Sequence, residues 1–257
     1  MNGNKIQKLL ESLYPTSSAE KWDNVGLQVG TMNKDIEAIL ISLDLTMEVI
    51  MEAKANGVNL IICHHPAIFT PLKTIDSESY LGKMIHSLIK NDITLYVMHT
   101  NFDVSSNGMN VILGKKLGLT NVSIFDVIDE DYGLGVIGLI ERQRADYLIS
   151  DIKAEFGIEA VKYIGNLKDT IEKVAIIGGS GADYVYQAIE HDVDLFITGD
   201  VTYHKALDCK NLGLNVLDIG HYFESHGIKE LREILLSKGI KIPVLVSNIN
   251  TNPYKNV

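Results

Sequence analysis

Cysteine is scarce in this chain of 257 residues: only Cys63 and Cys209 are present, which excludes a disulfide-stabilised scaffold. Nowhere do about 18 apolar residues run together, so we expect no membrane-spanning helix and no membrane partner. The first residues carry no apolar segment behind a basic one, so we expect no secretory signal. An excess of positive charge is also missing. The formal net charge of −10 argues against a dedicated nucleic-acid binder, and the expectation is a soluble, cytoplasmic protein.

The chain does have a regular alternation of apolar, β-branched segments with amphipathic ones. We expect strands at residues 35–44, 58–63, 93–98, 133–141, 160–165, 173–179, 194–199, 214–220 and 243–248. Between them the spacing predicts helices, one of which is capped by Thr46 and ends at Gly57. Near-continuous apolar strands separated by helices indicate an α/β protein whose sheet is mostly parallel and covered on both faces. Residues 122–133 carry four acidic side chains and are the best candidate for a domain boundary.

Polar side chains that can bind metals gather just after the predicted strands. In a sheet of this kind, functional groups lie past the carboxyl ends of the strands. Five of the eight histidines fall there, namely His64, His65, His99, His204 and His221. Such a concentration is unexpected for residues scattered at random, and Asp103 and Glu224 add carboxylates close by.

The His64-His65 pair favours a site for two neighbouring metal ions. Adjacent side chains in an extended segment point in opposite directions, and Pro66 biases His65 toward that conformation. A carboxylate such as Asp103 can give one oxygen to each ion. His221 and Glu224 are three residues apart at a strand-to-helix transition, so both can face one point. The alternatives are a hydrogen-bonded histidine pair in a buried loop and a glutamate placed there by the helix dipole.

Two further features allow more than one interpretation. His99 can be a metal ligand, a hydrogen-bond partner of a ligand or a proton shuttle, and His204 can also transfer protons. Both can instead be polar residues satisfied in loops. The glycine-rich turn Gly178, Gly179, Ser180 and Gly181 can bind an anion through its backbone N–H groups, but a tight strand-to-helix turn explains it equally well. The segment 22–30, with the only tryptophan, is interpreted as a structured loop without chemistry of its own.

Six motifs occur in the order found in one protein family: WDNVGLQVG, ICHHPAIF, MHTNFD, IGGSG, TGDVTYHKALD and DIGHYFES. Over residues 22–225 the sequence resembles the dinuclear-metal-centre hexamers, many of them named GTP cyclohydrolase 1 type 2 homologues (Nif-three-like or YbgI-like proteins). The resemblance implies two related α/β domains in a short form that lacks an inserted domain. Residues 1–127 with 215–257 would form a metal-binding domain that the C-terminal segment completes, and 128–214 the second domain. It also implies a toroidal homohexamer built as a trimer of dimers.

The resemblance further implies two divalent metal ions per chain. Its motifs place the ligands at His64, His65, Asp103, His221 and Glu224. Some members carry the glutamate four residues after the histidine, where this chain has Ser225, so Glu224 departs from the pattern by one position. Iron, zinc, manganese and nickel all accept imidazole and carboxylate ligands.

Such a site is suited to hydrolysis, and the family name implies opening of the imidazole ring of GTP. His99 or His204 would then move protons, and residues 178–181 or Lys205 would lie near the phosphates. Three alternatives stay open: a two-metal phosphoesterase, another amide or amidine hydrolase, and a non-catalytic metal-binding scaffold for a protein or nucleic-acid partner. Tyr203 stands where the phosphoesterase motif has its second aspartate.

Overall fold

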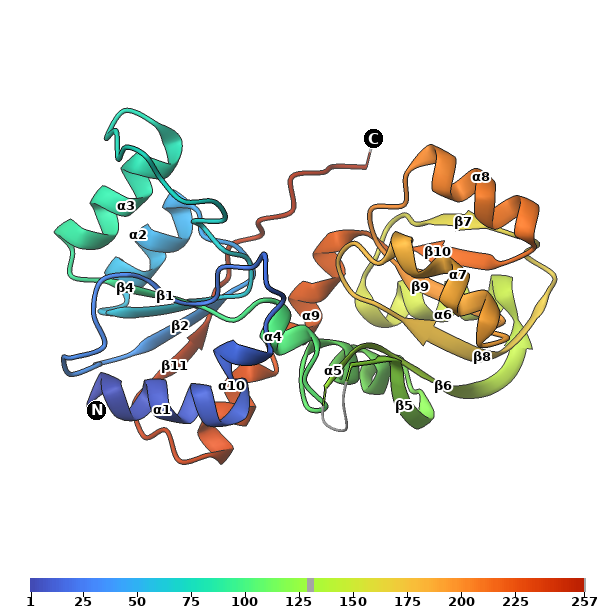
Figure 1. Ribbon diagram of the computed structural model, residues 1–257, viewed down its shortest axis with the longest axis horizontal. Helices are drawn as coiled ribbons and strands as arrows, with labels where there is room; N and C mark the ends of the chain where they lie inside the picture. The colour runs from blue at the N-terminus through green and yellow to red at the C-terminus, as the bar shows by residue number, and fades with distance from the viewer. Residues whose placement is uncertain (129–131, 257) are drawn as a thin grey trace. The chain divides into compact units, whose positions relative to one another are not determined.

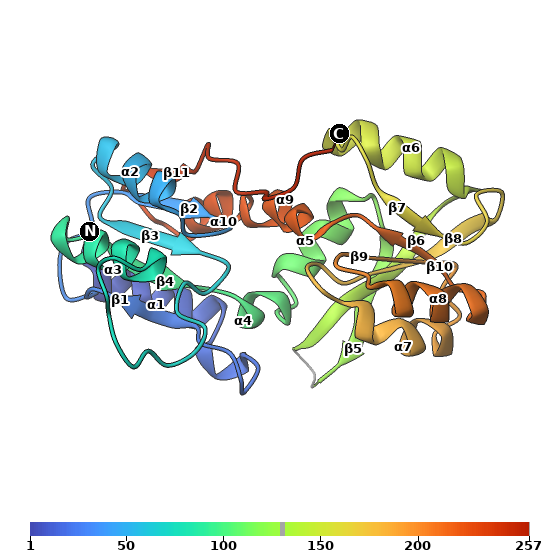
Figure 2. The ribbon, with the colours of Figure 1, turned by 90° about the horizontal axis from the view of Figure 1, so that it is seen from above.

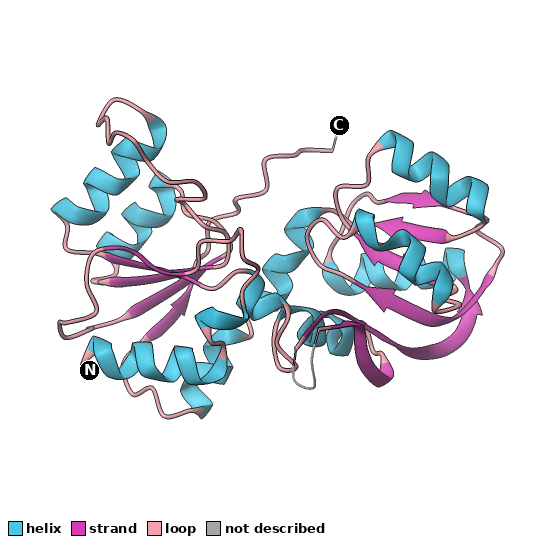
Figure 3. Ribbon diagram, in the orientation of Figure 1, coloured by secondary structure: helices cyan, strands magenta, loops and turns pink. Residues whose placement is uncertain are grey.

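The chain forms two compact units in a computed structural model that describes residues 1–128 and 132–256. The first unit comprises Met1–Phe102 and Ile228–Thr251, and the second comprises Asp103–Gly227 and the residues from Asn252 onward. The predicted domains divide the chain at other residues, so His221 and Glu224 lie in the second unit here. Figure 3 distinguishes the helices from the strands of both units, and each unit is described by itself below.

The sheet of the first unit has five strands in the order β1-β4-β3-β2-β11. They are β1 (Gly26–Val29), β2 (Ile39–Ser42), β3 (Leu60–Cys63), β4 (Thr94–Val97) and β11 (Val244–Val246). All neighbours are parallel except β1, which pairs antiparallel with β4. Helices α2 (Met47–Ala55) and α3 (Tyr80–Lys90) cover one face, and α1 (Gly3–Leu13) and α10 (Leu231–Ser237) the other (Figures 1 and 2). The predicted mostly parallel, doubly covered sheet is therefore confirmed for this unit.

Burial on both faces explains why these strands are apolar throughout. Every residue of β2, β3 and β4 is buried, as in parallel sheets with helices on both sides. One face packs against Ile50 of α2 and Leu88 of α3. On β4 the Tyr96 hydroxyl donates to Glu11 of α1 at 2.9 Å. The Thr46 side chain accepts a hydrogen bond from the Val49 amide and caps α2, as predicted.

The second unit contains a six-stranded mixed sheet in the order β5-β6-β8-β9-β10-β7. Its strands are β5 (Thr120–Val127), β6 (Gly133–Arg144), β7 (Lys162–Ile164), β8 (Thr170–Ile176), β9 (Leu195–Thr198) and β10 (Asn215–Asp218). Helix α6 (Ala145–Phe156) covers one face, while α7 (Val185–Glu190) and α8 (Tyr203–Leu212) cover the other (Figure 2). The unit also contains α5 (Met109–Lys116) and the short turn η2 (Ala182–Tyr184).

Two expectations are wrong for the second unit. Only β8–β9 and β9–β10 are parallel, whereas β5–β6, β6–β8 and β7–β10 are antiparallel, so this sheet is not mostly parallel. The predicted boundary segment 122–133 is also largely strand, because β5 covers its first residues and β6 begins at Gly133. Residues 129–131 of that segment lie outside the described residues. As the edge strand of the sheet, β5 exposes one side to solvent, and this explains its polar side chains and its one charged residue, Asp126.

The remaining elements are short and lie at strand ends. They are the turns η1 (Thr16–Ser18) and η3 (His221–Glu224) and the helices α4 (Thr100–Asp103) and α9 (Ser225–Ile228). Within residues 1–128 and 132–256, no helix is both long and apolar enough to cross a bilayer. The carboxyl ends of β3 and β4 meet at one edge of the first sheet, and β10 of the second sheet leads directly to η3.

Candidate metal centre

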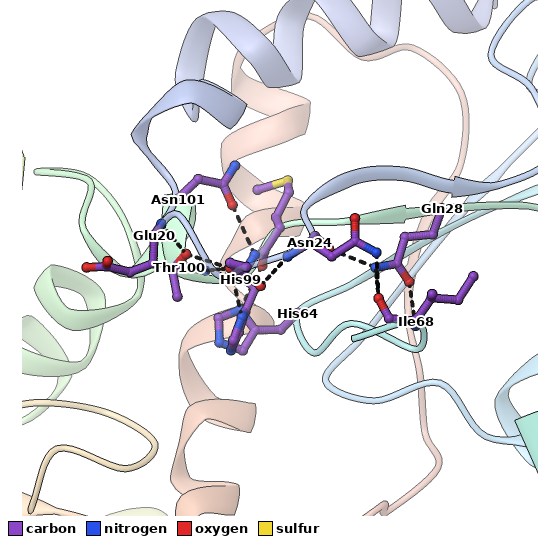
Figure 4. Close-up of polar contacts among 10 residues, drawn as sticks. Glu20, Asn24, Gln28, His64, Ile68, His99, Thr100 and Asn101 are labelled. Atoms are coloured by element: carbon purple, nitrogen blue, oxygen red, sulfur yellow. Dashed lines mark hydrogen bonds and ion pairs between the residues drawn. The ribbon is translucent and has the colours of Figure 1, made fainter. Parts of the chain in front are cut away.

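Three histidines converge at the carboxyl edge of the first sheet. His64 and His65 follow β3 directly, and His99 lies two residues beyond β4, the parallel neighbour of β3. One ring nitrogen from each of the three lies within 4.8 Å of the others, a spacing that suits a shared metal site. His64 is fully buried, and the side chain of His99 is 16% exposed. Figure 4 shows the rings of His64 and His99 side by side. The strand-exit argument therefore found residues that the fold brings together.

Each of these rings is oriented through its Nδ1 atom. The Nδ1 contacts are those of His64 with the Met98 carbonyl (2.8 Å), His65 with Asp44 (2.6 Å) and His99 with Asp23 (2.9 Å). A carbonyl or an ionised carboxylate can only accept, so these contacts favour the tautomer that carries the proton on Nδ1 in all three rings. In the neutral ring the lone pair then belongs to Nε2. This is the arrangement that metal-binding histidines use, because an oxygen acceptor on one nitrogen fixes the tautomer of the other.

The carboxylate of Asp23 is the most strongly engaged of these acceptors. Its side chain is 0% exposed, and it accepts from the backbone N–H and the hydroxyl of Thr100 as well as from His99. Burial would raise the pKa of Asp23, but the hydrogen bonds from His99 and Thr100 outweigh burial and lower the pKa to about 2. Asp23 is therefore ionised at neutral pH and acts only as an acceptor.

In the second unit, His221 and Glu224 lie on the turn η3 that follows β10. His221 Nε2 is 3.4 Å from Glu224 Oε2, and His221 Nδ1 is 2.7 Å from Asp200 Oδ2. A carboxylate oxygen of Asp103 lies within 4.8 Å of one of Glu224. The i, i+3 spacing therefore does bring His221 and Glu224 together, and the fold adds Asp103 to the pair. Asp200 orients His221 as the other aspartates orient their rings, from a left-handed backbone conformation (φ 54°).

The glycine-rich turn packs directly against this pair. A Cβ atom on Gly179 would lie 2.6 Å from Glu224 Oε1, and one on Gly178 would lie 3.2 Å from the same oxygen. The Gly178 amide donates to Asn110, and the Gly181 amide to Thr198, each at 2.8 Å. These two amides therefore have acceptors within the chain. Close approach to Glu224 accounts for glycine at 178 and 179, and the anion-binding role of the turn stays a prediction.

Asn110 of α5 connects the turn to the start of the second unit. Its side chain accepts from the Gly178 amide and donates to the backbone carbonyl of Asp103 at 3.1 Å. Asn110 is itself buried, so both bonds are sheltered from water. The hydrogen bonds tie the backbone of Asp103 to the turn that contacts Glu224.

Neither His204 nor Lys205 belongs to the groups of described residues that could hold a metal ion. His204 is exposed in the first turn of α8, where its ring contacts Tyr203. Lys205 pairs with Asp183 at 2.9 Å, and this hydrogen bond raises its pKa. Burial, and to a lesser degree the charge of Asp44, raises the pKa of the Cys63 thiol, which keeps the thiol protonated and unreactive. The roles predicted for His204 and Lys205 stay predictions.

Sequence reasoning missed the partners of the rings. Asp44 lies two residues beyond β2, so the strand-exit argument could have included it. Asp23 precedes β1 and is 76 residues from His99, and no local pattern connects them. The segment 22–30 does contribute to the site, contrary to our interpretation.

The donor types fit divalent metals of the first transition row. Each unit offers imidazole nitrogens or carboxylate oxygens at close range, and the rings are held by acceptors on the opposite nitrogen. In the first unit, His64, His65 and His99 form a group that could hold an ion such as zinc, iron, manganese or nickel. The second unit contributes ligand atoms of the same types from Asp103, His221 and Glu224.

Comparison with known proteins gives one consistent result. The family model for Duf34/NIF3 (NGG1p interacting factor 3) matches residues 1–253. Proteins named "GTP cyclohydrolase 1 type 2 homolog" are 44% identical in Clostridium perfringens, over 86% of both chains, and 37% identical in Lactococcus lactis, over 96% of both. A solved hypothetical protein of Staphylococcus aureus is 35% identical (TM-score 0.95, 100% of this chain and 99% of that one). A Bacillus cereus protein described as related to NIF3 is 28% identical (TM-score 0.95, the same coverage). The chain therefore belongs to the Duf34/NIF3 family.

Proposed function

We propose that this protein is a hydrolase that works with two divalent metal ions, bound through His64, His65, Asp103, His221 and Glu224. The observation that carries the proposal is the common orientation of the rings. In His64, His65 and His221 alike, Nδ1 contacts an oxygen acceptor, which leaves Nε2 as the ligand atom. Histidines that serve only packing need no such uniform arrangement. When bound, the ions would supply an electrophilic centre and would lower the pKa of water.

The reaction we propose is hydrolytic opening of the imidazole ring of a guanine nucleotide. The curated relatives are named as homologues of GTP cyclohydrolase 1 type 2, which supports this substrate class. One water adds to the ring carbon between the two nitrogens, a carbon–nitrogen bond breaks, and a formamide results. A second water then hydrolyses the formamide to formate and a free amine. The role we assign to His99 is to accept and return protons through Nε2 during these steps.

Turnover with separately loaded metals tests this function. The purified protein is loaded with Mn, Fe(II), Zn or Ni and assayed with GTP, and mass spectrometry follows loss of formate and release of phosphate. We expect formate loss with at least one metal and no turnover in the His65→Ala variant, which should also bind less metal. Replacing the exposed His86, which lies on α3, by alanine gives a matched control that should retain both properties.

Each other outcome contradicts a definite part of the proposal. Phosphate release without formate would replace the cyclohydrolase by a phosphoesterase. Silence with every metal, despite two bound ions per chain, would favour another substrate or a scaffold role. Normal metal content and turnover in His65→Ala would refute the ligand assignment.

We also propose that the chain assembles into a homohexamer, a trimer of dimers, on the strength of the family resemblance. Six chains of 28.4 kDa give a particle of about 170 kDa, and closed symmetric assemblies of this kind are common among soluble proteins. Light scattering coupled to size-exclusion chromatography measures this mass directly. A particle of one or two chains would refute the hexamer.

A further inference from the structure

The loop before β1 buries the carboxylate of Asp23, to which the proposed function assigns no role. Asp23 lies in the segment 22–30, yet its side chain is 0% exposed and its partners are His99 and Thr100, 76 and 77 residues further along the chain. A buried, ionised carboxylate is costly unless it is fully hydrogen-bonded. The hydrogen bonds from His99 and Thr100, just after β4, offset this cost, so Asp23 does more than form a turn.

The donors around Asp23 define the state of the ring. Oδ2 accepts from Thr100 N at 3.1 Å, from Thr100 Oγ1 at 2.5 Å and from His99 Nδ1 at 2.9 Å, while Oδ1 accepts from the Asn24 amide at 2.7 Å. The Thr100 hydroxyl itself accepts from the Glu20 amide at 3.0 Å (Figure 4). Its own proton is therefore directed to Asp23 Oδ2. With acceptor-only oxygens facing it, His99 can join this network only as a donor through Nδ1.

The rings of His64, His65 and Trp22 lie next to the ring of His99. The ring centroids of His64 and His65 are 5.2 Å and 5.7 Å from that of His99, and the Trp22 centroid is 6.1 Å away with its ring steeply inclined to the imidazole. The His99 backbone N–H also donates to the Asn101 side chain at 3.0 Å, which holds the main chain at this point. A ligand nitrogen of His99 lies within 4.8 Å of those of the other two histidines.

We propose that Asp23 is a positioning residue that holds His99 as the Nδ1–H tautomer, with the Nε2 lone pair directed toward His64 and His65. Thr100 donates two further hydrogen bonds to the same carboxylate oxygen, and the Trp22 ring lies next to that of His99. The proton transfer that this enables rests on the function proposed above, whereas the tautomer assignment does not. The class of step served is removal of a proton from water or from a reacting group beside the two histidines.

Nitrogen-15 NMR on the full-length, zinc-loaded protein with labelled histidine reports the tautomer of each ring. His99→Gln identifies the His99 signals. We expect the Nδ1–H form of His99 in the wild type. Asp23→Ala removes the acceptor, so His99 should lose this single tautomer. Asp23→Asn should largely retain it, because an amide oxygen in the Oδ2 position still accepts from His99 Nδ1 and from the backbone N–H and hydroxyl of Thr100. The amide nitrogen then faces only the backbone N–H of Asn24.

Metal content and kinetics separate positioning from folding. Asp23→Ala should keep the zinc content of the wild type, lower kcat by about 100-fold and change KM little, since correctly placed acid–base groups contribute about 10² to 10⁴. Asp35→Ala, at an exposed aspartate of the same unit, should leave tautomer, zinc content and kcat unchanged. Thr100→Val removes one donor and should leave the tautomer intact.

Several results would overturn the inference. An Nε2–H ring in the wild type would do so at once, whatever the variants do. An unchanged tautomer and kcat in Asp23→Ala would show that the carboxylate is structural, and loss of zinc in that variant would make it part of the metal site instead. Failure of the proposed function is a separate result, because a wild type without GTP turnover still gives the tautomer comparison.

Discussion

Replacing Gly179 by alanine tests whether close packing of the glycine-rich turn fixes Glu224. The new Cβ atom would lie 2.6 Å from Glu224 Oε1, and ordinary contact begins at 3.4 Å, so the carboxylate has to move by up to about 0.8 Å. Metal–ligand distances tolerate deviations of only about 0.2 Å. We expect the metal affinity to fall by about 10- to 100-fold, the range seen when the support of a ligand is lost.

The same substitution also has a backbone cost that needs a control. Gly179 has φ +64°, and a left-handed conformation costs an L-residue about 1–2 kcal/mol. Gly57 has the same φ and nothing within 4 Å of its added Cβ, so Gly57→Ala carries the backbone cost without the contact. In the metal-free protein both variants should lose thermal stability, about 2–4 °C per kcal/mol, and Gly179→Ala should lose more because its Cβ also displaces Glu224.

Competition with a coloured zinc chelator measures the affinity of both variants, and elemental analysis measures the number of bound ions. We expect weakened binding in Gly179→Ala and wild-type binding in Gly57→Ala. Equal zinc affinity and stoichiometry in the two variants would refute the reasoning, because it would mean that Glu224 moves without consequence for the metal.

Two further predictions concern the aspartates that hold the rings. Asp44 accepts from His65 at 2.6 Å, so Asp44→Ala should weaken zinc binding about 10- to 100-fold in the chelator assay, whereas Thr251→Val, which removes only the hydroxyl that donates to Asp44, should weaken it less. Equal affinity in Asp44→Ala and the wild type would contradict this. The folded-state pKa of Asp23 is about 2, below the usual 3.8, so its contribution of about 2 kcal/mol is complete above pH 4 and is lost as the pH falls toward 2. Urea unfolding of the metal-free protein at pH 5 and pH 2.5 should show a larger loss in the wild type than in Asp23→Asn, and parallel losses would argue against the shift.

The first sheet could be predicted because its strands are buried on both faces. Ile39–Ser42, Leu60–Cys63 and Thr94–Val97 are buried at every position, so the sequence shows uninterrupted apolar runs. The helix between two of them begins at a threonine that caps it, which is a local signal. An apolar run and a capping residue are both visible within a few consecutive residues, so the sequence was sufficient to predict these strands and this helix.

The second sheet could not be predicted in the same way because strand direction leaves little local trace. Leu195–Thr198 and Asn215–Asp218 are fully buried and parallel, but β7 pairs antiparallel with β10 at one edge and β5 pairs antiparallel with β6 at the other. Edge strands are half exposed, so their sequences are polar and resemble linkers. For this reason β5, which covers the first residues of the segment 122–133, resembles a linker in sequence.

In the candidate site, the histidines could be predicted from the sequence, but the residues that orient them could not. His64, His65 and His99 could be found because parallel strands end at one edge, so position in the sequence implies position in space. Their acceptors follow no such rule. Asp23 reaches His99 from a loop 76 residues away, and its selection depends on three donors meeting at one oxygen. Which nitrogen of a histidine faces a metal is therefore decided by contacts of long sequence separation, which a single sequence does not encode in any local pattern.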